Sequence, residues 1–275
     1  MMFTALGKSG KFLVLTIWLF FTIFPIYWMG LTSIKPKREV NDLYYIPNSS
    51  ATLDNYRSLF RDYAFGIFLR NSLIVSLVAS FIVICLGILG AYALARYEFT
   101  GKAQVMLAFL ATQMIPGLIS LAPLYLLMQK LGLLNSLIGL TLCYVGGMVP
   151  FSTMMLRGFI QRIPPELDEA ALIDGCNRFT ALFRVVAPVA LPGIAATFIF
   201  SFVQCWNELF LAMILIDSEG NKTFPVAMRS FIGGYWIEWG GLSAAVMVGI
   251  IPTVIIFGLM SKFMISGLSA GIVKG

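Results

Sequence analysis

Long apolar runs, separated by short polar stretches, dominate the pattern along this chain. Six runs are long enough to cross a bilayer, which takes roughly 20 helical residues. They lie near residues 12–34, 72–95, 105–127, 137–155, 193–216 and 241–263. Each is expected to be a helix, because a segment in lipid has no water to satisfy its backbone hydrogen bonds. The pattern predicts an all-α integral membrane protein, in which residues 1–275 form one domain with six transmembrane helices.

The third run is the least regular, because Pro116 and Gly117 lie inside it. Proline removes a backbone donor and disfavours the helical conformation of the preceding residue. We therefore expect a bend at this point. Such a bend is tolerated in a membrane where neighbouring helices or a cavity satisfy the freed backbone groups.

The composition excludes several classes of enzyme. Apolar residues make up 59% of the chain and charged residues 12%, and there is no histidine. Histidine is the commonest metal ligand and acid–base residue, so metal-dependent and Ser-His-Asp hydrolysis are not expected. The cysteines form no CxxC pair that would indicate a zinc site or a disulfide framework; they are Cys85, Cys143, Cys176 and Cys205. We predict no catalytic residue, no metal site and no cofactor bound by this chain.

The net charge of +6 comes from basic residues beside the apolar runs, which indicates membrane orientation rather than nucleic-acid binding. With both termini in the cytoplasm, ten of the 19 Lys and Arg residues lie inside and nine outside. Six of those nine fall in one long loop, residues 35–71. Discounting that loop, the distribution favours two cytoplasmic termini.

The connection between the fourth and fifth runs, residues 157–192, differs from the other connections. Pro164 and Pro165 suit the start of a helix, where a missing N–H costs little. Acidic residues then match the positive end of the helix dipole; they are Glu166, Asp168 and Glu169. The spacing of Leu167, Ala170 and Ala171 predicts one small apolar face.

Gly175 is expected to end this helix as a left-handed C-cap or a site of close backbone approach. A second short helix, about Arg178–Val186, should follow and end at Pro188. Two short helices at an angle would form a compact projection with an apolar stripe and acidic flanks. Such a projection fits a groove on another protein.

These residues resemble the EAA loop of ABC importer permeases. Glu169-Ala170-Ala171 is followed by three residues, Gly175, nine residues and Val185-Val186-Ala187-Pro188. The family pattern ends in I-x-L-P, so Val185 and Ala187 are mild departures. The resemblance implies a type I ABC importer permease, whose cytoplasmic coupling helix sits in a cleft of an ATP-binding subunit. The residues implied in that contact are Leu167, Glu169, Ala170, Ala171, Asp174, Gly175 and Pro188.

Other segments are similar to the maltose-type carbohydrate subfamily. They are Asn55-Tyr56-Arg57, Asn71-Ser72-Leu73, the stretch 90–96 with Phe99 and Gly101, Trp206-Asn207-Glu208, and the tail 266–275. The tail resembles the GLTAGAVKG ending of that group and is implied to contact the ATPase subunits through Ser269, Ala270, Gly271 and Lys274. The resemblance implies a multi-pass protein of the inner membrane. Its partners would be a second permease, two ATP-binding subunits that use ATP and Mg²⁺, and an extracytoplasmic solute-binding protein.

Polar residues inside the runs are candidates for the solute path. The spacing of Ser201, Gln204, Asn207 and Glu208 puts them on one helix face. A carboxylate near mid-membrane costs about 2.5–3.5 kcal/mol, so it should face protein or water. The alternative is a hydrogen-bonded contact with a partner helix. Gln113 is a further candidate, and Tyr92 and Trp206 are aromatic residues that would stack on a sugar or else pack in an interface.

Other readings of the cargo and the class stay open at this point. The cargo could be a non-sugar solute such as a glycerol phosphate ester, although the runs contain almost no basic residue for an anion. An ion-coupled secondary transporter could use Glu208 as a proton site. That class does not explain the 157–192 segment. The loop Asp217–Gly240 contains Tyr235, Trp236 and Trp239, which suit contact with an extracytoplasmic partner or anchoring at the lipid interface.

Overall fold

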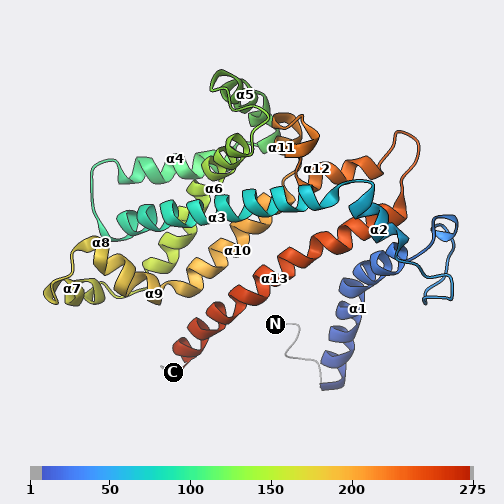
Figure 1. The fold of residues 1–275 in the computed structure, drawn as a ribbon. Coiled ribbons are helices and arrows are strands. Elements are labelled where there is room, and N and C mark those ends of the chain that lie inside the picture. The colour runs from blue at the N-terminus through green and yellow to red at the C-terminus, as the bar shows by residue number, and fades with distance from the viewer. Residues whose placement is uncertain (1–7, 273–275) are drawn as a thin grey trace. The chain divides into compact units, whose positions relative to one another are not determined.

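The computed structural model describes residues 8–272, and the side chains of residues 10–264. Nearly all regular structure in this range is helical. The β-type pairing found there is one isolated bridge between Ile232 and Ile237. The long helices are α1 (Lys8–Ser33), α3 (Phe65–Arg96), α6 (Leu137–Ile160) and α13 (Trp239–Ile272), as Figure 1 shows.

Two further apolar stretches each consist of helices that meet at a steep angle. Helices α4 (Lys102–Met114) and α5 (Gly117–Lys130) are bent by 103°. The helical run Arg178–Val189 and α10 (Leu191–Asn207) are bent by 82°. Within the described residues, four helices are long and apolar enough to cross a membrane, or six if each bent pair is one span. The exact number of spans stays a prediction.

Short elements connect these helices. They are the helices α2 (Asp54–Arg61), α7 (Glu166–Ile173), α8 (Arg178–Ala181), α9 (Ala187–Val189), α11 (Phe210–Leu215) and α12 (Phe224–Met228), the 3₁₀ turns η2 (Lys37–Glu39), η4 (Glu219–Asn221) and η5 (Arg229–Phe231), and the π-helical turn η3 (Leu182–Val186).

The bend predicted at Pro116 and Gly117 is present. Ile115 ends α4 in an extended conformation, with φ −76° and ψ 118°. A residue that precedes proline is pushed out of the helical region, because its backbone clashes with the proline ring. The 103° angle between α4 and α5 follows from this local restriction.

The chain divides into two compact units, and the first takes the residues up to Gly66 together with Met228–Ile251. Buried Asn55 holds this unit together, because its side-chain amide donates to the carbonyls of Ser33 and Lys35 at 2.9 and 2.8 Å. Tyr63 donates to Oε2 of Glu238 at 2.9 Å. Burial, reinforced by that carboxylate, raises the pKa of Tyr63.

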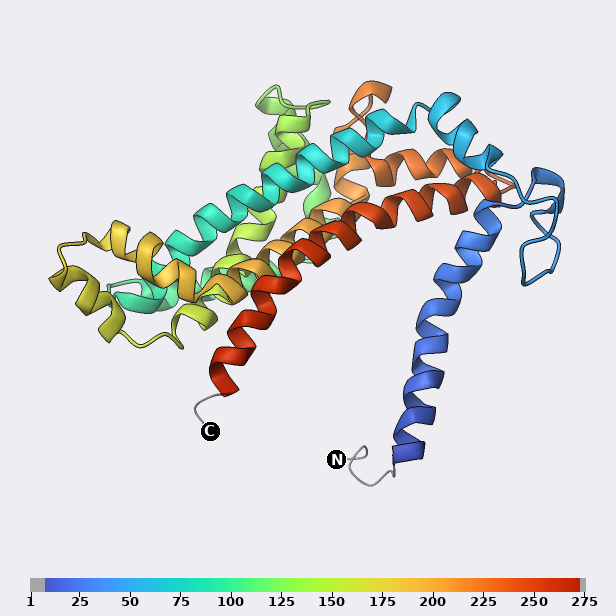
Figure 2. The same ribbon diagram turned by 60° about the horizontal axis from the view of Figure 1, so that its bottom comes forward.

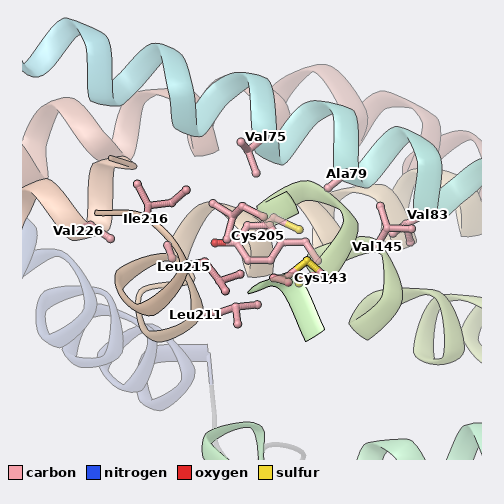
Figure 3. Close-up of a cluster of buried hydrophobic side chains, with 14 residues drawn as sticks. Val75, Ala79, Val83, Cys143, Val145, Cys205, Leu211, Leu215, Ile216 and Val226 are labelled. Carbon is pink, nitrogen blue, oxygen red and sulfur yellow. The ribbon is translucent and has the colours of Figure 1, made fainter. Parts of the chain in front are cut away.

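The second unit takes Ile67–Ala227 and the residues from Pro252 onward. In this unit, α6 packs against both α4 and α10. Among its described residues, two apolar clusters contribute to the core. Figure 3 shows the larger one, in which side chains of α3, α6, α10 and α11 meet. Its labelled members include Val75, Ala79 and Val83 of α3, Cys143 of α6 and Leu211 of α11.

The contact between α6 and α10 depends on small side chains. A Cβ at Gly193 would lie 2.3 Å from Cγ of Phe159, so only glycine allows this approach. Further along, the hydroxyls of Ser152 and Ser201 lie 3.2 Å apart. Both residues are buried. Close packing of small residues with an occasional hydroxyl pair is typical of helices in membranes.

Candidate functional site

The 157–192 segment contains two short helices that lie together beside the end of α3, as Figures 1 and 2 both show. Helix α7 begins at Glu166, directly after Pro164 and Pro165. At its other end, Cys176 N–H bonds to the carbonyl of Ala171 at 3.0 Å, and Gly175 N–H bonds to that of Leu172 at 3.1 Å. This pair of bonds is the Schellman motif, which needs a left-handed residue at Gly175. Gly175 has φ +85°, so the predicted left-handed cap is confirmed.

Asp168 points inward from α7 and attaches this helix to α3. Its Oδ2 accepts from Nε of Arg96 at 2.7 Å, and its Oδ1 accepts from the hydroxyl of Tyr92 at 2.8 Å. Arg96 also donates from Nη2 to the carbonyl of Ile163 at 2.9 Å. The side chains of Arg96 and Asp168 are 9% and 11% exposed. The carboxylate is therefore desolvated and held by two charged or polar donors.

The opposite face of α7 is exposed. Glu169, Ala170 and Leu167 lie there, whereas Ala171 is buried. The predicted face of Leu167, Ala170 and Ala171 is therefore divided between solvent and core, because Ala171 follows Asp168 by one helical turn and shares its inward direction.

Large apolar side chains extend this exposed surface from the last residue of α7 into α8. Ile173 is 86% exposed and Phe179 is 63% exposed. The rings of Phe179 and Phe183 pack together, with centroids 4.8 Å apart. Large exposed apolar groups beside carboxylates are a feature that protein-binding surfaces often have.

The second short helix differs from its prediction. Pro188 does not end it, because the helical run continues through η3 and α9 to Val189. The backbone widens before the proline, where Ala187 N–H bonds to the carbonyl of Leu182. This i→i+5 turn gives the proline ring room that a regular helix lacks. The chain turns instead at Ala190, which lies between Val189 and α10.

A cavity of about 440 Å³ lies deeper in the same unit. Helices α5, α6, α10 and α11 contribute its walls. The lining is mostly apolar, with four polar side chains, Ser120, Tyr144, Gln204 and Glu208. The described residues that line this cavity include no lysine or arginine. A mostly apolar cavity with a few polar groups is the common form of a small-molecule site.

Glu208 lies directly after α10, the helix that carries Ser201, Gln204 and Asn207. Gln204 and Glu208 line the same cavity, and the shared helix face of all four residues stays a prediction. Helix α10 ends at Asn207, and Glu208 is extended with φ −70° and ψ 122°. Its carboxylate accepts from the N–H groups of Leu211 and Ala212 at 2.9 and 3.0 Å. The hydroxyl of Tyr144 donates to it at 3.0 Å. A charge inside a span needs such donors, and the free N–H groups at the start of α11 supply them.

The other candidates for the solute path lie in different surroundings. Of the residues predicted to lie on the solute path, Gln204 and Glu208 are the two found among the described residues of the cavity wall. Trp206 is 2% exposed and stacks between Phe202 and Phe224. Buried as they are, Trp206 and Tyr92 do not present a ring face to the cavity.

The remaining polar candidates bond locally. Asn207 donates to the carbonyl of Val203 at 3.0 Å, and Ser201 pairs with Ser152. Gln113 is exposed and donates to the hydroxyl of Thr112 at 3.2 Å. None of these three lies among the described residues of the cavity wall. Their assignment to a solute path stays a prediction.

The implied contacts of the tail lie outside what the structure describes. Lys274 is beyond the described residues, and for Ser269, Ala270 and Gly271 only the helical backbone of α13 is described. Their role stays a prediction. Among the described residues, no group of three His, Cys, Asp or Glu side chains could hold a metal ion.

The inward-facing set of Tyr92, Arg96 and Asp168 was missed by sequence reasoning. The available signal was the spacing of Tyr92 and Arg96, four residues apart at the end of a predicted span. Residues four apart lie on one helix face. A phenol and a guanidinium on one face at the end of a span require an acceptor, which Asp168 supplies.

These features define a class of protein: a membrane-embedded helical bundle with an exposed pair of short helices at one end. Its fold is that of a type I ABC importer permease. A chain of the crystal structure of a bacterial ABC transporter involved in the import of the acidic polysaccharide alginate matches it with a TM-score of 0.77 and 22% identity. The match covers 94% of this chain and 98% of that chain.

The sequence comparisons give the family. The model of the family described as "Binding-protein-dependent transport system inner membrane component" matches residues 83–270. The chain belongs to this family. It is 36% identical over 271 residues to the sulfoquinovosyl glycerol transport system permease protein SmoH of Agrobacterium fabrum, covering 98% of this chain and 95% of the relative. It is 34% identical over 256 residues to the diacetylchitobiose uptake system permease protein DasC of Streptomyces coelicolor, covering 92% of each.

Proposed function

We propose that this chain is the membrane-spanning permease subunit of an ATP-driven importer for a sugar or sugar-derived solute. It forms half of the translocation pathway and is not itself an ATPase, since its sequence has no G-x-x-x-x-G-K-[ST] motif. ATP and Mg²⁺ are used by two partner subunits. Their closure drives alternating access to the pathway.

The exposed surface of the 157–192 segment supports this proposal most directly. Glu169 faces away from the bundle, while Asp168 beside it faces inward. The large exposed side chains of Ile173 and Phe179 extend the outward surface. An apolar surface with acidic flanks on two short helices suits a cleft in a protein partner. The partner we assign to it is the ATP-binding subunit, with the segment and both chain termini in the cytoplasm.

The proposed cargo follows from the relatives and the cavity. The names of the relatives SmoH and DasC refer to sulfoquinovosyl glycerol and to diacetylchitobiose. The cavity wall adds a carboxylate, Glu208, and the amide of Gln204. The described wall contains no basic group, so an anionic cargo would need its counter-charge from another subunit.

A second permease and an extracytoplasmic binding protein complete the proposed complex. None of the residues in the most apolar stretch of α1, within Gly10–Ser33, is buried. Its large apolar side chains need lipid or another subunit around them. The loop residues Tyr235, Trp236 and Trp239 are also exposed, and we assign them to the binding-protein side.

The function is tested by reconstituting the chain with its partners in proteoliposomes and measuring ATP-dependent sugar uptake and sugar-stimulated ATP hydrolysis. Glu169→Lys reverses a charge on the outward face of α7. We expect uptake and stimulation to be lost while the protein is recovered folded, because Glu169 is exposed. The matched control is Glu98→Lys, since Glu98 is exposed near the same end of α3 and pairs only at the surface with Lys102.

Two outcomes would overturn the proposal. Uptake that continues without ATP and follows a proton gradient would favour a secondary transporter with Glu208 as its proton site. Stimulation by a glycerol phosphate ester and by no saccharide in a panel would keep the importer but replace the cargo.

A further inference from the structure

Asp168 makes a buried ion pair at a place where the adjacent carboxylates are exposed. The Arg96–Asp168 pair has its two side chains 9% and 11% exposed, whereas Glu166 and Glu169 on the same helix lie in the open. Burying two charges costs free energy that their attraction offsets only when further hydrogen bonds complete the site. Tyr92 and the carbonyl of Ile163 supply those bonds at 2.8 and 2.9 Å. These hydrogen bonds therefore hold the carboxylate of Asp168 and the guanidinium of Arg96 in fixed orientations.

Two more contacts attach the second short helix to α3. Leu182 and Val186 of η3 are buried in the same apolar cluster as Ile88, Ala91 and Tyr92. In addition, the guanidinium of Arg178 lies 5.0 Å from the ring centroid of Tyr97, the residue after α3. Such a cation over an aromatic face is attractive. Both short helices thus hold the same end of α3 by independent means.

Helix α3 leads from this attachment to the wall of the cavity. It runs without a break for 32 residues, from Phe65 to Arg96. Its Val75, Ala79 and Val83 are buried in the cluster that also holds Tyr144 and Cys205, two residues of the cavity wall. A continuous helix with packed contacts at both places transmits displacement as one element.

We propose that Asp168 is a positioning residue of the transport cycle, which locks the 157–192 segment to α3 so that they move as one rigid body. This inference rests on the proposed function for its ATP-driven displacement. Asp168 touches neither ATP nor solute. It acts through Arg96 and Tyr92, and its effect is to carry motion of the outward face of α7 into the cavity wall. Without this ion pair, the 157–192 segment still docks on the ATP-binding subunit, but its displacement is not transmitted to α3.

The first test measures coupling in the full complex reconstituted in proteoliposomes. Asp168→Asn keeps the size of the side chain and removes its charge. We expect the complex to assemble and hydrolyse ATP without solute as the parent does, while solute transported per ATP falls by about tenfold, within the usual range for coupling between sites. Asp168→Glu keeps the carboxylate and should retain more coupling than Asp168→Asn. Glu98→Gln removes a surface ion pair nearby and should transport as the parent does.

Parent-like transport per ATP in Asp168→Asn would overturn the proposal. So would an equal loss of basal hydrolysis and transport together with failed assembly in both Asp168 variants, because that pattern belongs to a residue needed only for folding. The ratio of transport to hydrolysis is the readout that a purely structural role would not change.

The second test measures the lock itself. Spin labels at Thr100→Cys, in the turn after α3, and at Glu166→Cys, at the start of α7, report the distance between these two parts; both residues are exposed. The four native cysteines are first replaced by alanine or serine. We expect one narrow distance distribution, the same with and without ATP, and a broader distribution in Asp168→Asn. A parent distance that changes with ATP, or an unchanged distribution in Asp168→Asn, would contradict the rigid attachment.

Measuring this distance requires neither transport nor ATP hydrolysis by the complex. A complex that fails to transport sugar would overturn the proposed function, yet the label distances would still judge the lock between Asp168 and α3. The two proposals can therefore fail separately.

Discussion

Tyr144 donates a hydrogen bond of 3.0 Å from its hydroxyl to Oε2 of Glu208, across the break between α10 and α11. The same carboxylate accepts the first free N–H groups of α11, those of Leu211 and Ala212. One side chain therefore accepts hydrogen bonds from two N–H groups that the first turn of α11 leaves without an intrahelical partner. The carboxylate also lines the cavity, so the helix break and the cavity wall depend on the same residue.

Replacing this carboxylate should destabilise the protein. In Glu208→Leu, the hydroxyl of Tyr144 and two N–H groups lose their acceptor, and each buried unsatisfied group costs about 1–3 kcal/mol. We expect a clear drop in the thermal unfolding temperature of the detergent-purified chain. Asn207→Leu is the matched control, because Asn207 is exposed and bonds only to its own helix. Equal unfolding temperatures for the two variants would show that Glu208 is not a structural cap.

The end of α7 gives a second prediction. Gly175 has φ +85° and open space around the position of a Cβ, so substitution there strains the backbone without a clash. We expect Gly175→Ala to cost about 1–2 kcal/mol, the usual penalty for a left-handed residue with a Cβ. Gly175→Asn should cost less, because asparagine adopts this conformation more readily.

This order of stability is checked by chemical unfolding of the purified chain, with far-ultraviolet circular dichroism as the readout. If Gly175→Asn is less stable than Gly175→Ala, the side chain meets an obstacle, and backbone strain is not the cause. Sugar-stimulated ATP hydrolysis in the complex should decline in the same order as stability, since the Schellman motif sets the path from α7 to α8.

Of two adjacent glycines in α6, one lines the cavity and the other does not. A Cβ at Gly146 or at Gly147 meets nothing within 4 Å, but only Gly147 lines the cavity. Gly147→Leu should narrow the cavity and reduce the rate of sugar uptake, while Gly146→Leu should transport at close to the parent rate. Equal uptake by both variants would mean that solute does not pass this wall. Comparing expression and unfolding temperature of the two variants controls for misfolding.

Local patterns in the sequence were enough to predict several parts of the site. The bend at Pro116 and the left-handed cap at Gly175 depend on the residues themselves and their immediate neighbours, and both are present. The outward direction of Glu169 also follows from helix geometry once Ala171 is placed inside.

Other parts depend on contacts between distant residues, which spacing alone does not give. The sequence indicated only that Asp168, as an acidic residue, matches the dipole at the start of a helix. Its partners Tyr92 and Arg96 lie more than 70 residues earlier, so spacing along the sequence did not indicate the ion pair. The end of α10 at Asn207 was not predicted, because the residues at this break include no proline or glycine to signal it. The carboxylate itself stabilises that break by capping α11.

The central claim is that the exposed surface of the 157–192 segment lies in an ATP-binding subunit, and site-specific photo-cross-linking tests it most directly. A photoreactive amino acid at Ile173 or Phe179, both largely exposed, should cross-link to the ATPase subunit in membranes that contain the assembled complex. The same group at Leu107, exposed on α4, should give no such product. Absence of an ATPase adduct from both segment positions, or an adduct with the extracytoplasmic binding protein instead, would contradict the account.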